Sequence, residues 1–157
     1  TYLLTLWIIY MLHRKYYVIN MCLPLIIGAF FYLLFRPDIL LSRTIYAIFN
    51  IRPFSLLYDR IIENAIGRLL VNYSCDFLWA YSLAWSLLYL KSIFGCSMRK
   101  TICYCIVTDC IMELLQLIDY MGGTFDYYDI VIQILATLVA LIIHRIHIRK
   151  EESENEK

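Results

Sequence analysis

The stretch that decides the fold is TICYCIVTDCIMELLQLIDYM, residues 101–121, an apolar run that carries acidic side chains. Asp109, Glu113 and Gln116 are spaced so that they share one face of a helix. A carboxylate at the centre of a membrane helix costs about 2.5–3.5 kcal/mol on insertion scales, so such residues face a protein interior or a wet cavity. We therefore expect a membrane helix whose polar face contributes to a functional site.

The composition of the whole chain favours an integral membrane protein. Of its 157 residues, 62% are hydrophobic and 17% are charged, and the mean hydropathy is +0.67. Soluble domains have about 25% charged residues. The net charge of +1 and the lack of a long basic run argue against a nucleic-acid partner.

Segments of spanning length divide the chain into an all-α, polytopic bundle. Four stretches reach the roughly 20 residues that a span needs: 16–35, 73–94, 101–120 and 126–147. Pro24 and Gly28 are tolerable in the first, because neighbouring helices satisfy loosened backbone groups. The chain then divides into a clipped hydrophobic segment with a basic flank, a membrane domain and a charged, frayed tail: 1–15, 16–150 and 151–157.

The connection between the first two spans has an amphipathic pattern of its own. In residues 57–70, apolar pairs alternate with polar pairs in a four-residue repeat. This pattern predicts an interfacial helix that is too charged to span. Residues 39–50 are a candidate for a shorter companion helix.

The distribution of lysine and arginine indicates the orientation. Basic residues lie before the first span, at the turn between the second and third spans, and after the fourth span: Arg14, Lys15, Lys91, Arg99, Lys100, Arg145, Arg149 and Lys150. Residues 119–129, between the last two spans, have none, so the positive-inside rule predicts that both termini of the four-helix core lie inside. The five arginines of residues 36–72 oppose this orientation, and we expect them to rest on phospholipid headgroups.

This topology predicts that the scattered polar residues meet at the outer membrane face. The predicted site residues come from the second, third and fourth spans: Asp76, Glu113, Gln116, Asp126 and Asp129. Asp109 lies near mid-depth, and Arg68 of the amphipathic segment is a candidate cationic partner.

Simpler roles remain open for several of these residues. Asp126 and Asp129 suit the N-cap and the first turn of the fourth helix. Gln116 and Gln133 suit interhelical hydrogen bonds, and Asp76 is near enough to a helix end to be solvated.

Other chemistries have little support in the sequence. The three histidines lie at the predicted inner face, far from the acidic residues, and no GxSxG, HExxH or Walker loop occurs. The six cysteines form no CxxC pair and suit packing better than disulfides or zinc binding. The carboxylates could bind Mg²⁺ or Ca²⁺, but their spacing is not diagnostic, and we predict neither metal nor cofactor.

The run 113–116 (ELLQ) is followed by a glycine-containing turn and the run 124–129 (TFDYYD). This order of an E-x-x-Q and a D-x-x-D element resembles the VanZ-like membrane protein family. The run 76–81 (DFLWAY) is similar to its signature in the second helix. The resemblance covers about residues 70–143. The chain has Gly123 or Thr124 in place of a common arginine, and residues 133–136 (QILA) in place of an Asn-x-x-Gly.

The resemblance implies a small multi-pass protein of the bacterial cytoplasmic membrane. Some members of the family are associated with resistance to lipophilic glycopeptides such as teicoplanin. The family supplies no settled reaction. By resemblance, the motif positions in this chain are Asp76, Glu113, Gln116, Asp126 and Asp129.

Three functions fit these observations. We favour a non-enzymatic role at the outer face, in which the polar cluster binds an envelope lipid or another envelope component, or excludes a glycopeptide. The alternatives are a membrane enzyme acting on a lipid-linked envelope substrate and a small proton-coupled carrier. Asp109 and Glu113 would serve the carrier as a relay, but no acidic residue continues their path to the inner face.

Overall fold

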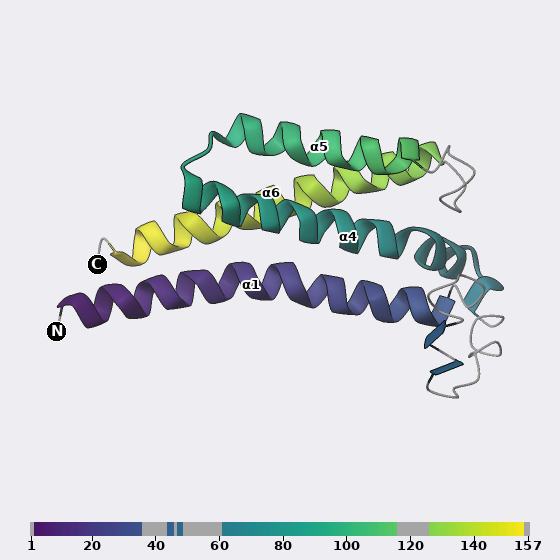
Figure 1. Cartoon of the computed structure of the whole chain (residues 1–157), viewed down its shortest axis with the longest axis horizontal. Coiled ribbons are helices and arrows are strands. Elements are labelled where there is room, and N and C mark those ends of the chain that lie inside the picture. Colours follow the sequence, from purple (N-terminus) through teal and green to yellow (C-terminus); the bar gives the residue numbers. More distant parts are fainter. Residues whose placement is uncertain (1, 36–43, 46, 49–60, 116–125, 156–157) are drawn as a thin grey trace.

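All the regular secondary structure in the described part of the chain is helical, as the sequence predicts. The computed structural model describes residues 2–35, 44–45, 47–48, 61–115 and 126–155. Within these ranges four helices form the fold: α1 (Tyr2–Phe35), α4 (Ala65–Phe94), α5 (Met98–Leu115) and α6 (Tyr127–Asn155) (Figure 1). Gln116 and residues 117–125 lie outside the described residues, so the predicted place of Gln116 in the site remains a prediction.

The helices run alternately up and down, with α4 at the centre. Helix α4 packs against α1, α5 and α6, and α5 also packs against α6. At one end of the bundle α4 begins, α5 ends and α6 begins (Figure 1); we call it the Asp126 end. The turn from α4 to α5 marks the opposite Gly95 end, and α1 begins and α6 ends on that side (Figure 1).

Helix α1 is longer than the predicted span. It continues without a break through His13-Arg14-Lys15, where the sequence predicts the boundary between a separate segment and the first span. A basic triplet limits how deep a helix sits in lipid, but it does not stop a helix, because arginine and lysine are good helix formers. The helix also continues through Pro24, as predicted.

The prediction of one continuous helix over 57–70 is wrong in its described part. Residues 63–64 form a turn, and the backbone at Asn64 is extended, with φ −95° and ψ 145°. Helix α4 begins at Ala65, so it takes in the second half of the amphipathic pattern. The four-residue repeat correctly predicts that residues 65–70 are helical. It cannot show that these residues continue into the next span without a break. Residues 57–60, and most of 39–50, lie outside the described residues.

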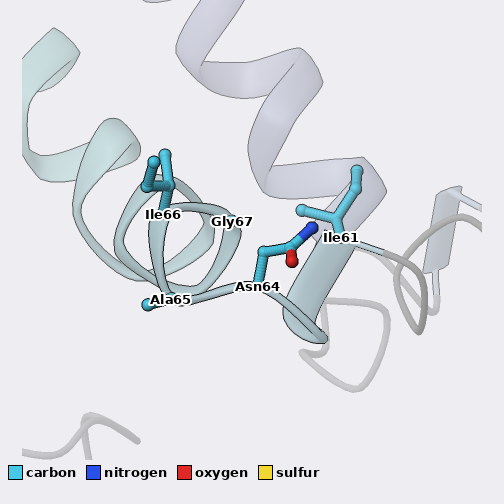
Figure 2. A pocket seen from close by; sticks show the side chains of 5 residues that line it. All are labelled: Ile61, Asn64, Ala65, Ile66 and Gly67. Atoms are coloured by element: carbon cyan, nitrogen blue, oxygen red, sulfur yellow. The ribbon is translucent and has the colours of Figure 1, made fainter.

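The start of α4 depends on a close backbone approach at Gly67. A Cβ atom at this position would lie 1.8 Å from the carbonyl oxygen of Ile61. Figure 2 shows the open hollow beside this contact, which is lined by Ile61, Asn64, Ala65, Ile66 and Gly67. Asn64 is its one polar side chain, and none of the acidic residues discussed below lines it.

Two further boundaries follow from short-range interactions. Gly95 ends α4 in the left-handed conformation, with φ 66°, and its N–H donates to the carbonyl of Lys91. Helix α6 continues to Asn155, so most of the tail predicted to be frayed is helical. The ion pairs His147–Glu151 at 3.2 Å and Lys150–Glu154 at 4.0 Å support this last part, because residues four apart are neighbours on a helix.

The core is small and rich in alanine and aromatic residues, whereas the outer faces of the helices are apolar. The buried apolar cluster comprises Tyr17, Ala80, Tyr81, Ala84, Trp85, Leu88, Cys105, Ala136 and Ala140. Large hydrophobic side chains such as Ile26, Phe30, Ile142 and Ile146 are exposed on the outside. Helices α4 and α6 are long and apolar enough to cross a membrane.

Candidate functional site

Helix α5 presents a single buried face to the bundle. Thr101, Cys105, Asp109 and Glu113 follow one another at four-residue intervals, and all four are buried. Asp109 and Glu113 are each only 1% exposed. The prediction that these two carboxylates share an inward face of one helix is confirmed.

Glu113 is tied to α6 by a buried hydrogen bond. The Nε2 amide of Gln133 donates to Oε1 of Glu113 over 2.7 Å. Gln133 therefore has the interhelical role that the sequence analysis left open for it. When the Glu113 carboxyl is ionised, this is a charge-assisted bond, which is stronger than a bond between neutral groups.

Asp109 lies one turn further into the bundle. Thr137 lies one turn along α6 from Gln133. Its side chain approaches the carboxyl of Asp109 but does not meet the geometry of a hydrogen bond. Glu113 lies one turn from Asp109 on the same buried face of α5. Antiparallel packing thus sets Glu113 against Gln133 and Asp109 against Thr137. We call these four residues the α5–α6 seam.

Asp126 caps α6 and joins it to α4. Its Oδ1 accepts from the backbone N–H of Tyr128 at 2.9 Å, the contact expected of an N-cap side chain. Its Oδ2 accepts from the hydroxyl of Tyr73 on α4 at 3.3 Å. Asp129 lies in the first turn of α6, where a negative charge is favourable. The capping role that the sequence left open for Asp126 is therefore present, together with a contact between helices.

Asp76 and Arg68 are the remaining predicted site residues in the described part of the chain. Asp76 is half-buried on α4, one turn after Tyr73, so it belongs to the Asp126 end. Arg68 is exposed, and its guanidinium donates to the carbonyl of Ile62 at 3.1 Å. No ion pair joins Arg68 to a carboxylate among the described residues.

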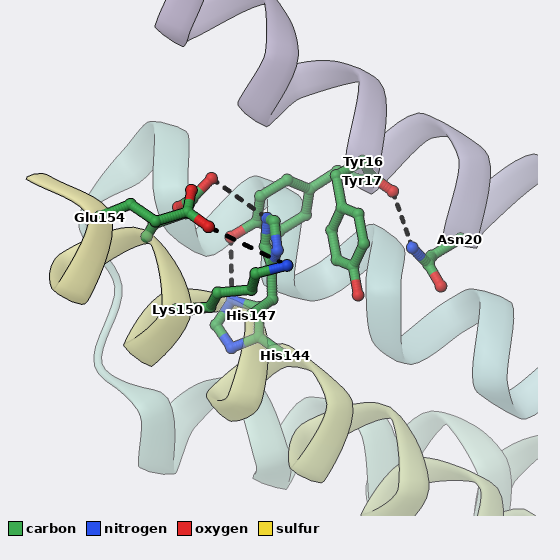
Figure 3. Close-up of polar contacts among 8 residues, drawn as sticks. Tyr16, Tyr17, Asn20, His144, His147, Lys150 and Glu154 are labelled. Atoms are coloured by element: carbon green, nitrogen blue, oxygen red, sulfur yellow. Dashed lines mark hydrogen bonds and ion pairs between the residues drawn. The ribbon is translucent and has the colours of Figure 1, made fainter.

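A second polar cluster, nearer the Gly95 end, is absent from the predicted site. The hydroxyl of Tyr17 and Nε2 of His144 are 2.8 Å apart, and His144 is 1% exposed (Figure 3). The ring of Tyr16 stacks on that of His147, with centroids 3.6 Å apart. Trp85 packs edge-on against both tyrosines and His144. We call this group the Tyr17–His144 cluster.

A signal for this cluster exists in the sequence. Gln133, Thr137, Ala140 and His144 recur at helical spacing, and all four are buried, so His144 belongs to the polar stripe that begins with Gln133. Considered only as metal ligands or triad members, the histidines give no sign of this contact in the sequence. A helical projection of residues 127–155 would have placed His144 inside the bundle.

The site residues do not gather as a typical transition-metal centre. Among the described residues, no three His, Cys, Asp or Glu side chains come together in a way that could hold a metal ion. All six cysteines are free thiols, and Cys105 is the buried one.

Comparisons of the chain with protein families, with curated proteins and with solved structures found no match.

Proposed function

We propose that this chain is a multi-pass integral membrane protein of the VanZ-like type, which acts at the outer face of the bacterial cytoplasmic membrane on an envelope component. The support for a membrane location is the distribution of polarity. Asp109, Glu113, Gln133 and His144 are buried, whereas long apolar side chains cover the outside of all four helices. In water this distribution would leave large hydrophobic patches exposed, whereas in lipid it is the expected one.

The lengths of the helices support a bundle that crosses the bilayer. Helix α4 has 30 residues and α6 has 29, or about 45 Å each at 1.5 Å per residue, against about 30 Å of hydrocarbon. Helix α5, with 18 residues, is about 27 Å long, close to the minimum for a span. We propose that α1 and α5 cross the membrane with α4 and α6.

The basic residues support an orientation with the Gly95 end inside. Lys91, Arg99 and Lys100 flank the turn between α4 and α5. The stacking of Tyr16 on His147 brings the basic flanks of α1 and α6 to the same level. The positive-inside rule then places the Asp126 end outside.

The single observation that carries the proposed activity is the convergence of carboxylates and amides toward the Asp126 end. Asp126 and Asp129 open α6, Asp76 lies near the start of α4, and the Glu113–Gln133 pair lies just below them. Acceptor groups of this kind bind cationic or polyhydroxyl ligands, because carboxylates accept hydrogen bonds and attract positive charge. Envelope lipids with sugar headgroups and lipophilic glycopeptides both belong to this class.

The test compares the wild-type protein with Glu113→Gln and Asp129→Asn variants at matched membrane levels. We expect both variants to lose binding of a sugar-bearing envelope lipid in nanodiscs and to change susceptibility to teicoplanin. Glu152→Gln, in the C-terminal part of α6, is the matched control and should behave as wild type. If both site variants bind the lipid and respond to teicoplanin as the wild type does, the proposal is wrong.

A further inference from the structure

Several buried oxygen atoms in the α5–α6 seam have no hydrogen-bond donor. Both carboxylate oxygens of Asp109, Oε1 of Gln133 and Oγ1 of Thr137 lack a hydrogen-bond partner among the described residues. The three side chains are at most 3% exposed. Buried polar atoms are nearly always satisfied, so a group of unsatisfied atoms requires an explanation such as a bound ion.

These oxygens belong to one place in the bundle. Thr137 approaches Asp109 across the two helices. Gln133 is one turn from Thr137 and is held by its hydrogen bond to Glu113, which is one turn from Asp109. The amide NH₂ of Gln133 is engaged with Glu113, so its carbonyl oxygen is the group left over.

The group has an excess of acceptors over donors. A carboxylate and an amide oxygen offer only lone pairs, and the Thr137 hydroxyl has a single hydrogen to give. That hydrogen satisfies one acceptor at most. A cation bound among these oxygens would satisfy the acceptors that this hydrogen does not reach. Among the described residues, no lysine or arginine forms an ion pair with Asp109.

We propose that the α5–α6 seam binds a monovalent metal cation of the sodium type through Asp109, Thr137 and Gln133. The ligand atoms are all oxygen atoms, which suit hard cations rather than zinc or copper. Mg²⁺ retains several waters, and divalent cations usually draw on more carboxylates than this group supplies. One carboxylate with two neutral oxygens matches a single positive charge. The site is independent of the proposed binding of an envelope component.

The test measures thermal unfolding and ²²Na⁺ binding of the purified protein in detergent. NaCl is compared with choline chloride at equal ionic strength, and MgCl₂ and CaCl₂ serve as further arms. At about 100 times the dissociation constant, Na⁺ should raise the midpoint of unfolding by about 5 °C or more, and ²²Na⁺ binding should saturate. Equal midpoints in NaCl and choline, without saturable binding, would overturn the proposal. Displacement of ²²Na⁺ by Ca²⁺ or Mg²⁺ at lower concentration than by Na⁺ would overturn the assignment to a monovalent ion.

Variants at Thr137 separate ligation from folding. Thr137→Ser keeps the hydroxyl and should bind Na⁺ as the wild type does, whereas Thr137→Val keeps the shape, removes the oxygen and should bind about tenfold more weakly. Asp109→Asn should abolish the effect of Na⁺ on the midpoint, and Asp126→Asn, at the bundle end, should leave it intact. Equal Na⁺ affinity in the serine and valine variants would contradict the assigned ligands. The variant Asp129→Asn lies outside the α5–α6 seam and tests envelope binding separately, so the two proposals can fail independently.

Discussion

The hydrogen bond between Gln133 and Glu113 allows a quantitative test of the packing of α5 on α6. Its length of 2.7 Å is shorter than the usual 2.9–3.0 Å of an N–H···O bond, and both side chains are buried. Hydrogen bonds to charged groups contribute about 1.5–3 kcal/mol in soluble proteins, while double-mutant cycles between membrane helices average about 0.6 and reach about 1.7 kcal/mol. Gln133→Leu also leaves Oε1 of Glu113 without this donor. We therefore expect a loss of about 2 kcal/mol of unfolding free energy.

The measurement is unfolding by SDS in mixed micelles, followed by circular dichroism, for Gln133→Leu, Glu113→Leu and the double variant. Replacing both partners by apolar groups should recover about 1 kcal/mol relative to the sum of the single changes, because no polar atom is then stranded. Val131→Leu, at an exposed position of α6, is the control and should lie within about 0.5 kcal/mol of wild type. A Gln133→Leu protein as stable as the control, with no coupling in the cycle, would refute this view of the seam.

The same unfolding titration tests three other contacts. Gly67→Ala should lower the free energy of unfolding by about 1–3 kcal/mol, because the new Cβ atom would meet the Ile61 carbonyl oxygen. Wild-type stability in this variant would show that the two backbone segments are not as close as described. Asp126→Ala should cost about 1 kcal/mol through loss of the N-cap, whereas Asp126→Asn should be nearly neutral; equal losses in the two variants would contradict the capping role. Tyr17→Phe should cost about 1 kcal/mol, because His144 loses the hydroxyl 2.8 Å from Nε2, and an unchanged midpoint would contradict that bond.

The buried face of α5 was predictable from the sequence because its cause is local. Asp109 and Glu113 are four residues apart in an apolar helix, and a carboxylate that faces hydrocarbon is costly. The residues opposite them were not predictable in the same way. Whether Gln133 or a neighbour meets Glu113 depends on how α5 and α6 slide against each other, and the helical period alone does not fix that register.

The differences between the sequence-based predictions and the structure have separate physical origins. Hydropathy indicates which part of a helix can lie in lipid, and not where the helix begins or ends. The span boundaries predicted at Lys15 and Tyr73 are therefore not helix ends, because α1 and α4 continue past them. The contact between Tyr17 and His144 joins residues 127 positions apart, and no local pattern predicts such a pair. The role of Arg68 as a cationic partner stays a prediction; its described contact is with the Ile62 carbonyl.

Labelling of single-cysteine variants with a membrane-impermeant maleimide tests the central claim most directly, namely that the bundle spans the membrane with its Asp126 end outside. One variant keeps only Cys96, which is exposed in the turn at the Gly95 end. The other lacks all native cysteines and carries Tyr127→Cys, at a position that is 76% exposed at the start of α6. We predict that intact cells label position 127 and that Cys96 reacts only after permeabilisation. Labelling of Cys96 in intact cells, with or without labelling of position 127, would contradict the claim.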